Sequence, residues 1–360
     1  MPLFDLGPKE SRRALYGRDA EVESLVRLIR NGRWSVILGP RMVGKTSLAK
    51  AGAHQSGVPS VYVNLWGVKG VAGLLDALGE GINSNKPLLR RVRDTLRRIE
   101  GLNVLGTGIT IAPPSRPLRT VHEILDALGG AHRRTVVILD EVQELAASSG
   151  ALLKLLANVF NTRPRVTFVF TGSVFGLIRT LLAPTTSSPL FGRSPVRIDL
   201  RPFDRDEAFG FLARGFREYG AAPAPEVVRR SIEHALDGSP GWLTYYGNCV
   251  AVQRMDLADA ERATVQEGMK VARSEIAHFL QGRDSATHWT ALRVLTRPVT
   301  WSELRDGLAA ARGSRPNDHS LSNVLRSLRE AGLVEQTAET YQIGDPMVRA
   351  FVREARRAPS

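Results

Sequence analysis

The sequence predicts an α/β fold with a parallel sheet, because three short apolar segments each end in residues typical of the carboxyl edge of such a sheet. The first, residues 34–38, runs into a glycine-rich loop and then into a segment of helical composition. The second, residues 135–139, ends in two adjacent carboxylates. The third, residues 165–170, ends in a Thr-Gly-Ser turn. Strands separated by helical segments in this way favour parallel pairing.

The loop after the first segment reads GPRMVGKT, a match to the phosphate-binding pattern G-x-x-x-x-G-K-T. Its two glycines allow the backbone to curl around phosphate oxygens, and the following helix directs its N-terminal amides at the same point. We expect Lys45 to reach the β- and γ-phosphates of a nucleotide, and the Thr46 hydroxyl to bind Mg²⁺. The residues expected to contact the nucleotide here are Gly39, Pro40, Arg41, Met42, Val43, Gly44, Lys45, Thr46 and Ser47.

The two carboxylates after the second segment are Asp140 and Glu141. We expect Asp140 to hold Mg²⁺, directly or through a water, and Glu141 to polarise the attacking water. An acidic pair at the end of a strand is common, but this pair follows Lys45 by 95 positions. Together the two motifs predict a P-loop NTPase. In P-loop folds with such a pair an extra strand lies between the two motif strands, so the expected strand order is 5-1-4-3-2.

The third segment supplies a candidate sensor of the γ-phosphate, either Thr171 or Ser173, although the same residues could form a turn that only ends the strand. A guanine-specific site would require an Asn-Lys-x-Asp motif. Residues 161–164, the nearest match, read Asn-Thr-Arg-Pro. ATP is therefore the expected nucleotide, with Mg²⁺ as its cofactor.

The composition indicates a globular chain of two or three domains. Cys249 is the only cysteine, which excludes an intrachain disulfide and a cysteine-based zinc site. The longest uncharged apolar stretch, residues 166–178, is too short to cross a bilayer, so we expect a cytoplasmic protein without a membrane partner.

The charge is strongly basic, with a formal net charge of +13. This favours a polyanionic partner, with nucleic acid ahead of a membrane surface. The excess is uneven, because residues 86–119 contain eight basic and two acidic residues. The stretch is either a basic patch that contacts nucleic acid or a solvated helix face.

The motifs together resemble those of the archaeal-type ATPases of the STAND clade, relatives of the AAA+ proteins that include the Cdc6/Orc1-like initiators. Residues 16–21 (YGRDAE) are similar to the N-terminal "GR..E" box of that family, which implies that Gly17 and Arg18 lie along the nucleotide base. Arg41 within the loop is also typical of the family. Residues 189–193 (PLFGR) are similar to a further family element, which implies that Arg193 contacts the γ-phosphate or couples it to other domains; a surface arginine in a turn is the alternative.

The same resemblance implies a helical lid with a G-x-P signature, matched here by residues 238–240, so that Pro240 packs near the base. From the residues alone, Ser239 and Pro240 also form a good helix start. Asp204 and Glu207 have the spacing of a capping box that opens the first lid helix. The expected domains are a P-loop ATPase core at 1–202, a lid at 203–285 and a winged helix-turn-helix at 286–360.

The winged-helix prediction comes from the order of segments after residue 287, in which three short helices precede a hairpin. In the third helix, Leu321, Val324, Leu325 and Leu328 recur at helical spacing and should face the core. The outward residues that could contact DNA are Asn323, Arg326 and Arg329.

Three functions remain open from the sequence. The first is a slow, Mg²⁺-dependent ATPase that acts as a nucleotide-controlled switch and engages DNA through the winged helix. The second is an ATPase regulatory scaffold that binds a protein partner and no nucleic acid. The third is a nucleotide binder with negligible hydrolysis. No second arginine of the AAA+ pattern stands out after the lid helices, so assembly into a ring is not implied and a monomer remains possible.

Overall fold

The computed structural model describes residues 2–105, 108–112, 116–130, 134–172, 177–313, 316–355 and 357–359. The chain divides into two compact units. One contains residues 8–39 and 44–200, and we call it the sheet unit. The other contains residues 1–7, 40–43 and 201–360, and we call it the helical unit. The expected domain boundaries at 202/203 and 285/286 stay a prediction; the division between the two units lies at 200/201 in this part of the chain.

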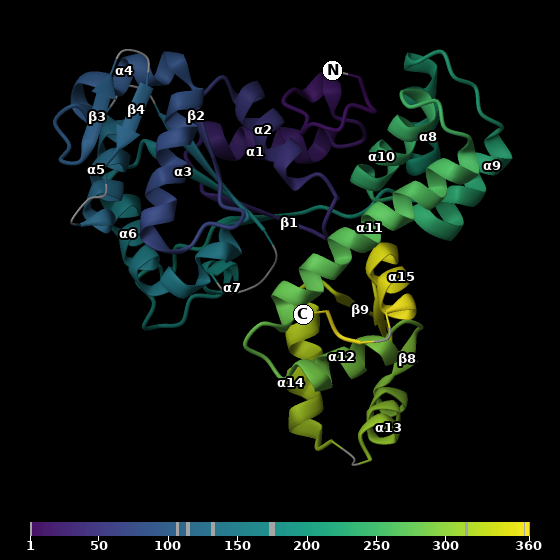
Figure 1. Cartoon of the computed structure of the whole chain (residues 1–360). Helices are drawn as coiled ribbons and strands as arrows, with labels where there is room; N and C mark the ends of the chain where they lie inside the picture. Colours follow the sequence, from purple (N-terminus) through teal and green to yellow (C-terminus); the bar gives the residue numbers. More distant parts are fainter. Residues whose placement is uncertain are drawn as a thin grey trace. The chain divides into compact units, whose positions relative to one another are not determined.

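Five of the described strands form the parallel sheet of the sheet unit (Figure 1). They are β1 (Ser35–Leu38), β2 (Ser60–Asn64), β5 (Thr135–Asp140), β6 (Val166–Thr171) and β7 (Val196–Asp199). Their order is β2-β5-β6-β1-β7. Numbered by position along the chain within this sheet, the order is 5-1-4-3-2 when read from the β7 edge. The predicted fold class is therefore confirmed.

Helices cover this sheet and connect its strands. They are η1 (Arg12–Ala14), α1 (Asp19–Arg30), α2 (Lys45–Ser56), α3 (Gly70–Ser84), α5 (Pro117–Gly130), η2 (Val142–Ser148), α6 (Ser149–Thr162) and α7 (Leu177–Leu182). Strands β1, β5 and β6 are buried along their whole length, which explains their largely apolar sequences. Helix α3 packs tightly on β2, because a Cβ at Gly81 would lie 2.4 Å from the Tyr62 carbonyl oxygen.

Between α3 and α5 the chain forms helix α4 (Lys86–Leu96) and a hairpin of β3 (Leu102–Leu105) and β4 (Gly108–Ile111). Asn83 joins the hairpin to α3, because its side chain donates to the Ile109 carbonyl oxygen (2.8 Å) and accepts from the Ile109 amide (2.7 Å). Helix α4 is amphipathic. Its buried residues are Leu88, Leu89, Val92 and Leu96, and its exposed basic residues include Lys86, Arg90 and Arg91.

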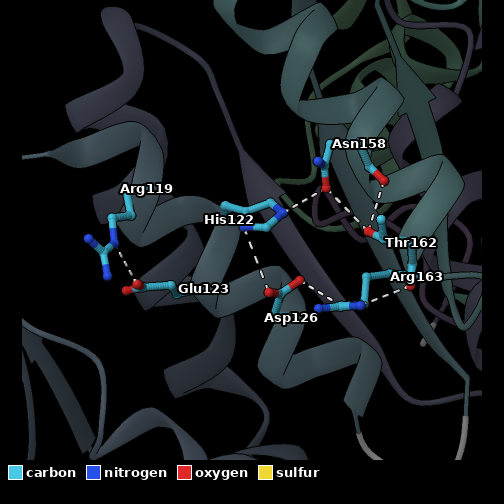
Figure 2. Close-up of polar contacts among 7 residues, drawn as sticks. All are labelled: Arg119, His122, Glu123, Asp126, Asn158, Thr162 and Arg163. Atoms are coloured by element: carbon cyan, nitrogen blue, oxygen red, sulfur yellow. Dashed lines mark hydrogen bonds and ion pairs between the residues drawn. The ribbon is translucent and has the colours of Figure 1, made fainter.

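A polar network connects α5 to α6 (Figure 2). His122 lies between Asn158 Oδ1, 2.8 Å from its Nε2, and Asp126 Oδ2, 3.7 Å from its Nδ1. Arg163 Nε donates to the other oxygen of Asp126 at 2.7 Å. These side chains are partly exposed, so the network contributes modestly to stability, on the order of 0–1 kcal/mol per ion pair.

The helical unit begins with helices α8 (Arg205–Glu218), α9 (Pro225–Ser231), η3 (Ile232–Leu236), α10 (Pro240–Ala251) and α11 (Leu257–Leu280). The predicted capping box at Asp204 and Glu207 is present at the start of α8. Phe4, from the N-terminal segment of the same unit, is fully buried against α8 and α10. A Cβ at Gly215 or Gly247 would lie 2.2 or 2.3 Å from the Phe4 ring, so both glycines are needed for this close packing.

The rest of the helical unit consists of α12 (Ser285–Val294), β8 (Val299–Thr300), α13 (Trp301–Arg312), α14 (Asp318–Glu330), β9 (Val334–Thr337), β10 (Thr340–Ile343) and α15 (Pro346–Glu354). The strands form a sheet in the order β8-β10-β9. The four residues of α14 that were predicted to face the core are buried. Within the described residues, no helix is long and apolar enough to cross a membrane.

Candidate functional site

The Asp140 carboxylate lies at the carboxyl edge of the parallel sheet and accepts hydrogen bonds from three hydroxyl groups. Thr46 Oγ1 and Tyr62 Oη donate to Oδ2 at 2.8 and 2.6 Å. Thr171 Oγ1 donates to Oδ1. The donors come from α2, β2 and β6, and Asp140 itself ends β5 and is 3% exposed. Four elements thus converge on one buried carboxylate.

The ends of the glycine-rich loop lie in the sheet unit beside this carboxylate. Gly39 follows β1, and its carbonyl oxygen accepts a hydrogen bond from Lys45 Nζ at 2.8 Å. Gly44 has φ 97°, a left-handed conformation that favours glycine, and it is the N-cap of α2. The first-turn amides of α2 lie at the end of the loop, and a helix N-terminus of this kind suits an anion.

Residues 40–43 of the loop belong to the helical unit and lie at the start of α10. The Gly241 amide donates to the Met42 carbonyl oxygen at 2.8 Å, and a Cβ at Gly241 would lie 2.6 Å from Met42 Cε. Arg41 lies 3.9 Å from Glu275 of α11. Pro240 is the first residue of α10, as predicted from the residues around it.

Glu141 has a constrained backbone and a held side chain. Its φ is 57°, unusual for a residue with a side chain. Its amide donates to Thr171 Oγ1 at 3.3 Å, and its Oε2 accepts a hydrogen bond from Gln143 Nε2. Gly172 leaves the space that Gln143 occupies, since a Cβ there would lie 2.1 Å from Gln143 Oε1.

Tyr62 is a member of the site that sequence reasoning missed. Burial, followed by the charge of Asp140, raises the pKa of the Tyr62 phenol, so the hydroxyl stays protonated and remains a donor at neutral pH. Lys50 Nζ lies 4.3 Å from the centroid of the Tyr62 ring and 3.1 Å from Glu10 Oε1. The sequence shows only that a tyrosine lies in the strand after the loop helix. Tyrosine is common in strands, so this position alone did not indicate a role in the site.

The two sensor candidates have different outcomes. Thr171 is fully buried, and its hydroxyl donates to Asp140 while accepting from the Glu141 amide. Its contacts therefore lie with the acidic pair, and its role as a sensor of the γ-phosphate stays a prediction. Ser173 lies outside the described residues.

Two residues carried over from the family resemblance, Arg193 and Arg18, contact other side chains of the sheet unit. Arg193 lies over the ring of Phe160, 5.6 Å from its centroid, and Phe160 packs against Trp34. Trp34 precedes β1, whereas Gly39 follows it, so the structure does not place Arg193 with Lys45 and Asp140. Arg18 is 5% exposed, and its Nη1 lies 3.4 Å from Oε1 of Glu21 in the first turn of α1. It directly follows Gly17, whose φ is 62°.

The candidate DNA-contacting residues Asn323, Arg326 and Arg329 are exposed on α14. Asn323 Nδ2 lies 3.3 Å from His319 Nδ1 one turn earlier. The three side chains therefore share the solvent side of this helix, opposite its buried leucines.

The residues at the Asp140 cluster fit a nucleotide-bound Mg²⁺. Mg²⁺ prefers oxygen ligands, keeps several waters, and is usually bound through one or two carboxylates together with substrate phosphates. Thr46 and Asp140 supply one hydroxyl and one carboxylate in direct contact with each other. Among the described residues, no group of three or more His, Cys, Asp or Glu side chains could hold a metal without such phosphates.

Comparison with protein families shows which family this chain matches. Residues 15–245 match the family model described as an ATPase domain predominantly from Archaea. The chain belongs to this family. The matched region includes Lys45, Asp140, Glu141 and Thr171, so the cluster around Asp140 lies within it. No curated protein matches the chain.

Several solved structures are similar to this chain over nearly its whole length, beyond the matched ATPase domain. The Walker-type ATPase PABY2304 of Pyrococcus abyssi has 26% identity and a TM-score of 0.80, with 98% of this chain and 99% of that chain covered. The Orc2 protein of Aeropyrum pernix, in ADPNP and ADP complexes, has 19% identity and a TM-score of 0.65, with coverages of 98% and 96%. The Orc1 protein of Aeropyrum pernix in complex with DNA has 15% identity and a TM-score of 0.50, with coverages of 98% and 95%.

Proposed function

We propose that this ATPase domain binds ATP with Mg²⁺ and hydrolyses it at the Asp140–Glu141 pair. The observation that carries the proposal is the direct hydrogen bond from Thr46, in the first turn after the loop, to Asp140 at the end of β5. It joins the expected phosphate site to the expected metal ligand. The family description and the nucleotide complexes of the Orc2 structure support nucleotide binding.

Each residue has a distinct proposed task. Lys45 and the first-turn amides of α2 bind the β- and γ-phosphates, and Thr46 and Asp140 would hold Mg²⁺. When bound, the ion neutralises charge on the phosphate oxygens. Glu141 accepts the proton of the water that attacks the γ-phosphorus, while Thr171 fixes the backbone of Glu141 and the carboxylate of Asp140.

Two substitutions test this assignment. Lys45→Ala should abolish most nucleotide affinity, measured by titration with a fluorescent ATP analogue, whereas Lys154→Ala, at an exposed position on α6, should leave it unchanged. Glu141→Gln should bind ATP normally. Its hydrolysis rate should fall by a factor of about 100 or more, as expected for loss of a general base. Normal turnover by the Gln variant would refute the role of Glu141.

We also propose that the ATPase is a slow switch of the STAND type, in which Gly17, Arg18 and Pro240 approach the adenine. The motifs at these positions match that family, and Pro240 begins the helix whose next residue, Gly241, donates to Met42 of the loop. A structure with a bound ATP analogue would test this, because each of the three residues should lie within van der Waals distance of the base.

DNA is the proposed partner of the switch. We propose that α12, β8, α13, α14, β9 and β10 form a winged helix-turn-helix, in which α14 exposes Asn323, Arg326 and Arg329. Helix α4 adds an exposed basic face in the sheet unit. The structural neighbour Orc1 was solved in complex with DNA, at an identity that supports a shared fold alone.

The DNA proposal predicts a steep fall of affinity with salt, because each neutralised phosphate releases counterions. Arg326→Ala with Arg329→Ala should weaken binding and reduce the slope of log K against log salt by about 1.8. Arg165→Ala, an exposed arginine of the sheet unit, provides the control. A binding constant that does not respond to salt would favour the alternative function, a regulatory ATPase that engages a protein and no nucleic acid.

A further inference from the structure

We propose that Tyr62 is a positioning residue that fixes the Asp140 carboxylate for Mg²⁺. The inference rests on the proposed function, since it assigns Asp140 to the metal. The evidence is the 2.6 Å hydrogen bond from Tyr62 Oη to Asp140 Oδ2, made from the strand that borders β5 at the edge of the sheet.

The carboxylate is held from both sides of its own strand. In the sheet order, β5 lies between β2 and β6. Tyr62 from β2 donates to Oδ2, and Thr171 from β6 donates to Oδ1. A carboxylate that accepts from opposite sides on its two oxygens cannot rotate about the Cβ–Cγ bond without losing both bonds. Its orientation is thus set by the sheet, independently of the loop.

The hydrogen-bond capacity of Asp140 leaves room for the metal site. An ionised carboxylate offers about four acceptor positions. Tyr62, Thr171 and Thr46 occupy three of them in this structure. Tyr62 and Thr171 therefore use two of the four acceptor positions of Asp140. The other two, one of which accepts from Thr46 here, can serve the groups that surround a nucleotide-bound ion.

Tyr62 is itself held by contacts other than Asp140. The main chain of β2 pairs with β5, so that Tyr62 lies opposite Ile138. The carbonyl oxygen of Tyr62 lies against Gly81 of α3. Lys50 of α2 lies over the ring, and its ammonium group is paired with Glu10. These contacts hold the ring in place, so the phenol hydroxyl is a preorganised donor.

The test is the Mg²⁺ dependence of nucleotide affinity in the full chain with Tyr62→Phe, which removes only the hydroxyl. Affinity for a fluorescent ADP analogue is measured in EDTA and across a Mg²⁺ titration. We expect the Mg²⁺ concentration for half-maximal affinity to rise about tenfold, as for loss of a hydrogen bond to a charged group, and the affinity in EDTA to stay at the wild-type value.

Tyr246→Phe is the matched control, because Tyr246 is a buried tyrosine whose hydroxyl lies 3.5 Å from Ser231 in the helical unit. Its Mg²⁺ dependence should equal that of the wild type. If Tyr62→Phe is less stable, the ratio of affinities with and without Mg²⁺ still decides, since partial unfolding lowers both equally.

The outcomes separate the inference from the proposed function. If the wild type gains nucleotide affinity with Mg²⁺ and Tyr62→Phe has the same Mg²⁺ dependence, the positioning role is refuted while the metal site stands. If the wild type itself binds no nucleotide, or binds it without any response to Mg²⁺, the proposed function fails first and the inference with it.

Discussion

Gln143 Nε2 donates a hydrogen bond to Glu141 Oε2, two positions earlier in the chain. The amide of Glu141 is held separately by Thr171, and its left-handed backbone directs the side chain. Glu141 is therefore restrained at both its backbone and its carboxylate. A general base needs such restraint, because proton transfer depends on geometry within hydrogen-bond reach of the water.

Gln143→Ala should lower kcat for ATP hydrolysis about tenfold, since Glu141 would lose its orienting donor while keeping its charge. The nucleotide Kd should not change, because Gln143 is not among the expected phosphate-binding residues. Single-turnover hydrolysis and a binding titration measure the two quantities. A variant with wild-type kcat would show that the Gln143 contact does not affect the base.

Arg193→Ala tests whether this residue acts on a neighbouring molecule. Its position beside Phe160 and Trp34 is at the other end of β1 from the loop, so an effect on the nucleotide of the same chain is not expected. The specific activity of the variant should equal that of the wild type at low protein concentration. It should fall below wild type only at concentrations where the wild-type activity rises through self-association. A loss of activity in the dilute protein would place Arg193 at its own site.

Phe4→Ala should destabilise the helical unit by about 3–5 kcal/mol, the usual cost of removing a fully buried phenylalanine. Cys249 reports on this unit, because it is buried in α10 and burial raises the pKa of its thiol, so it reacts slowly in the folded state. Its labelling by a thiol reagent should accelerate in the Phe4 variant. Unchanged labelling would mean that the N-terminal segment contributes little to the unit.

The capping box at Thr300 and Glu303 gives a pH dependence of defined sign. Hydrogen bonds from the Thr300 amide, and then from its hydroxyl, lower the pKa of Glu303 below its ordinary value. The folded state therefore favours the charged carboxylate. The contribution of this carboxylate to stability is fully present above the unfolded pKa of about 4.3, and it is lost as the pH falls through the lowered pKa of the folded state. In Glu303→Gln, melting temperatures measured from about pH 3 to pH 6 should vary less with pH than in the wild type. An identical pH profile in the two proteins would contradict this account.

Much of the fold was predictable because local patterns there agree with tertiary structure. The largely apolar segments before GPRMVGKT and before Asp140-Glu141 indicate buried parallel strands, and they correspond to β1 and β5. The spacing of Leu321 and Leu328 likewise predicted the buried face of α14. A local pattern was sufficient in each case, namely a largely apolar run for the two strands and helical spacing for α14.

The contacts of the site were less predictable because they join residues far apart in the chain. Tyr62 reaches Asp140 across 78 positions, and this pairing depends on the strand register. The hydrogen bond from Thr171 to Asp140 likewise joins the ends of two strands that are 31 positions apart in the chain. Arg193 was assigned from a motif alone, and a motif does not specify where a turn packs.

The burial of Phe4 has a consequence during protein synthesis. The residues that enclose its ring, from Phe211 in α8 to Gly247 in α10, emerge from the ribosome more than 200 residues after it. At about 5–20 residues per second, the Phe4 ring waits on the order of 10–40 s for these partners. The sheet unit can fold in that interval, whereas the helical unit cannot be completed until most of the chain has been translated. The Phe4 ring therefore stays without these partners in the nascent chain until α10 has been translated.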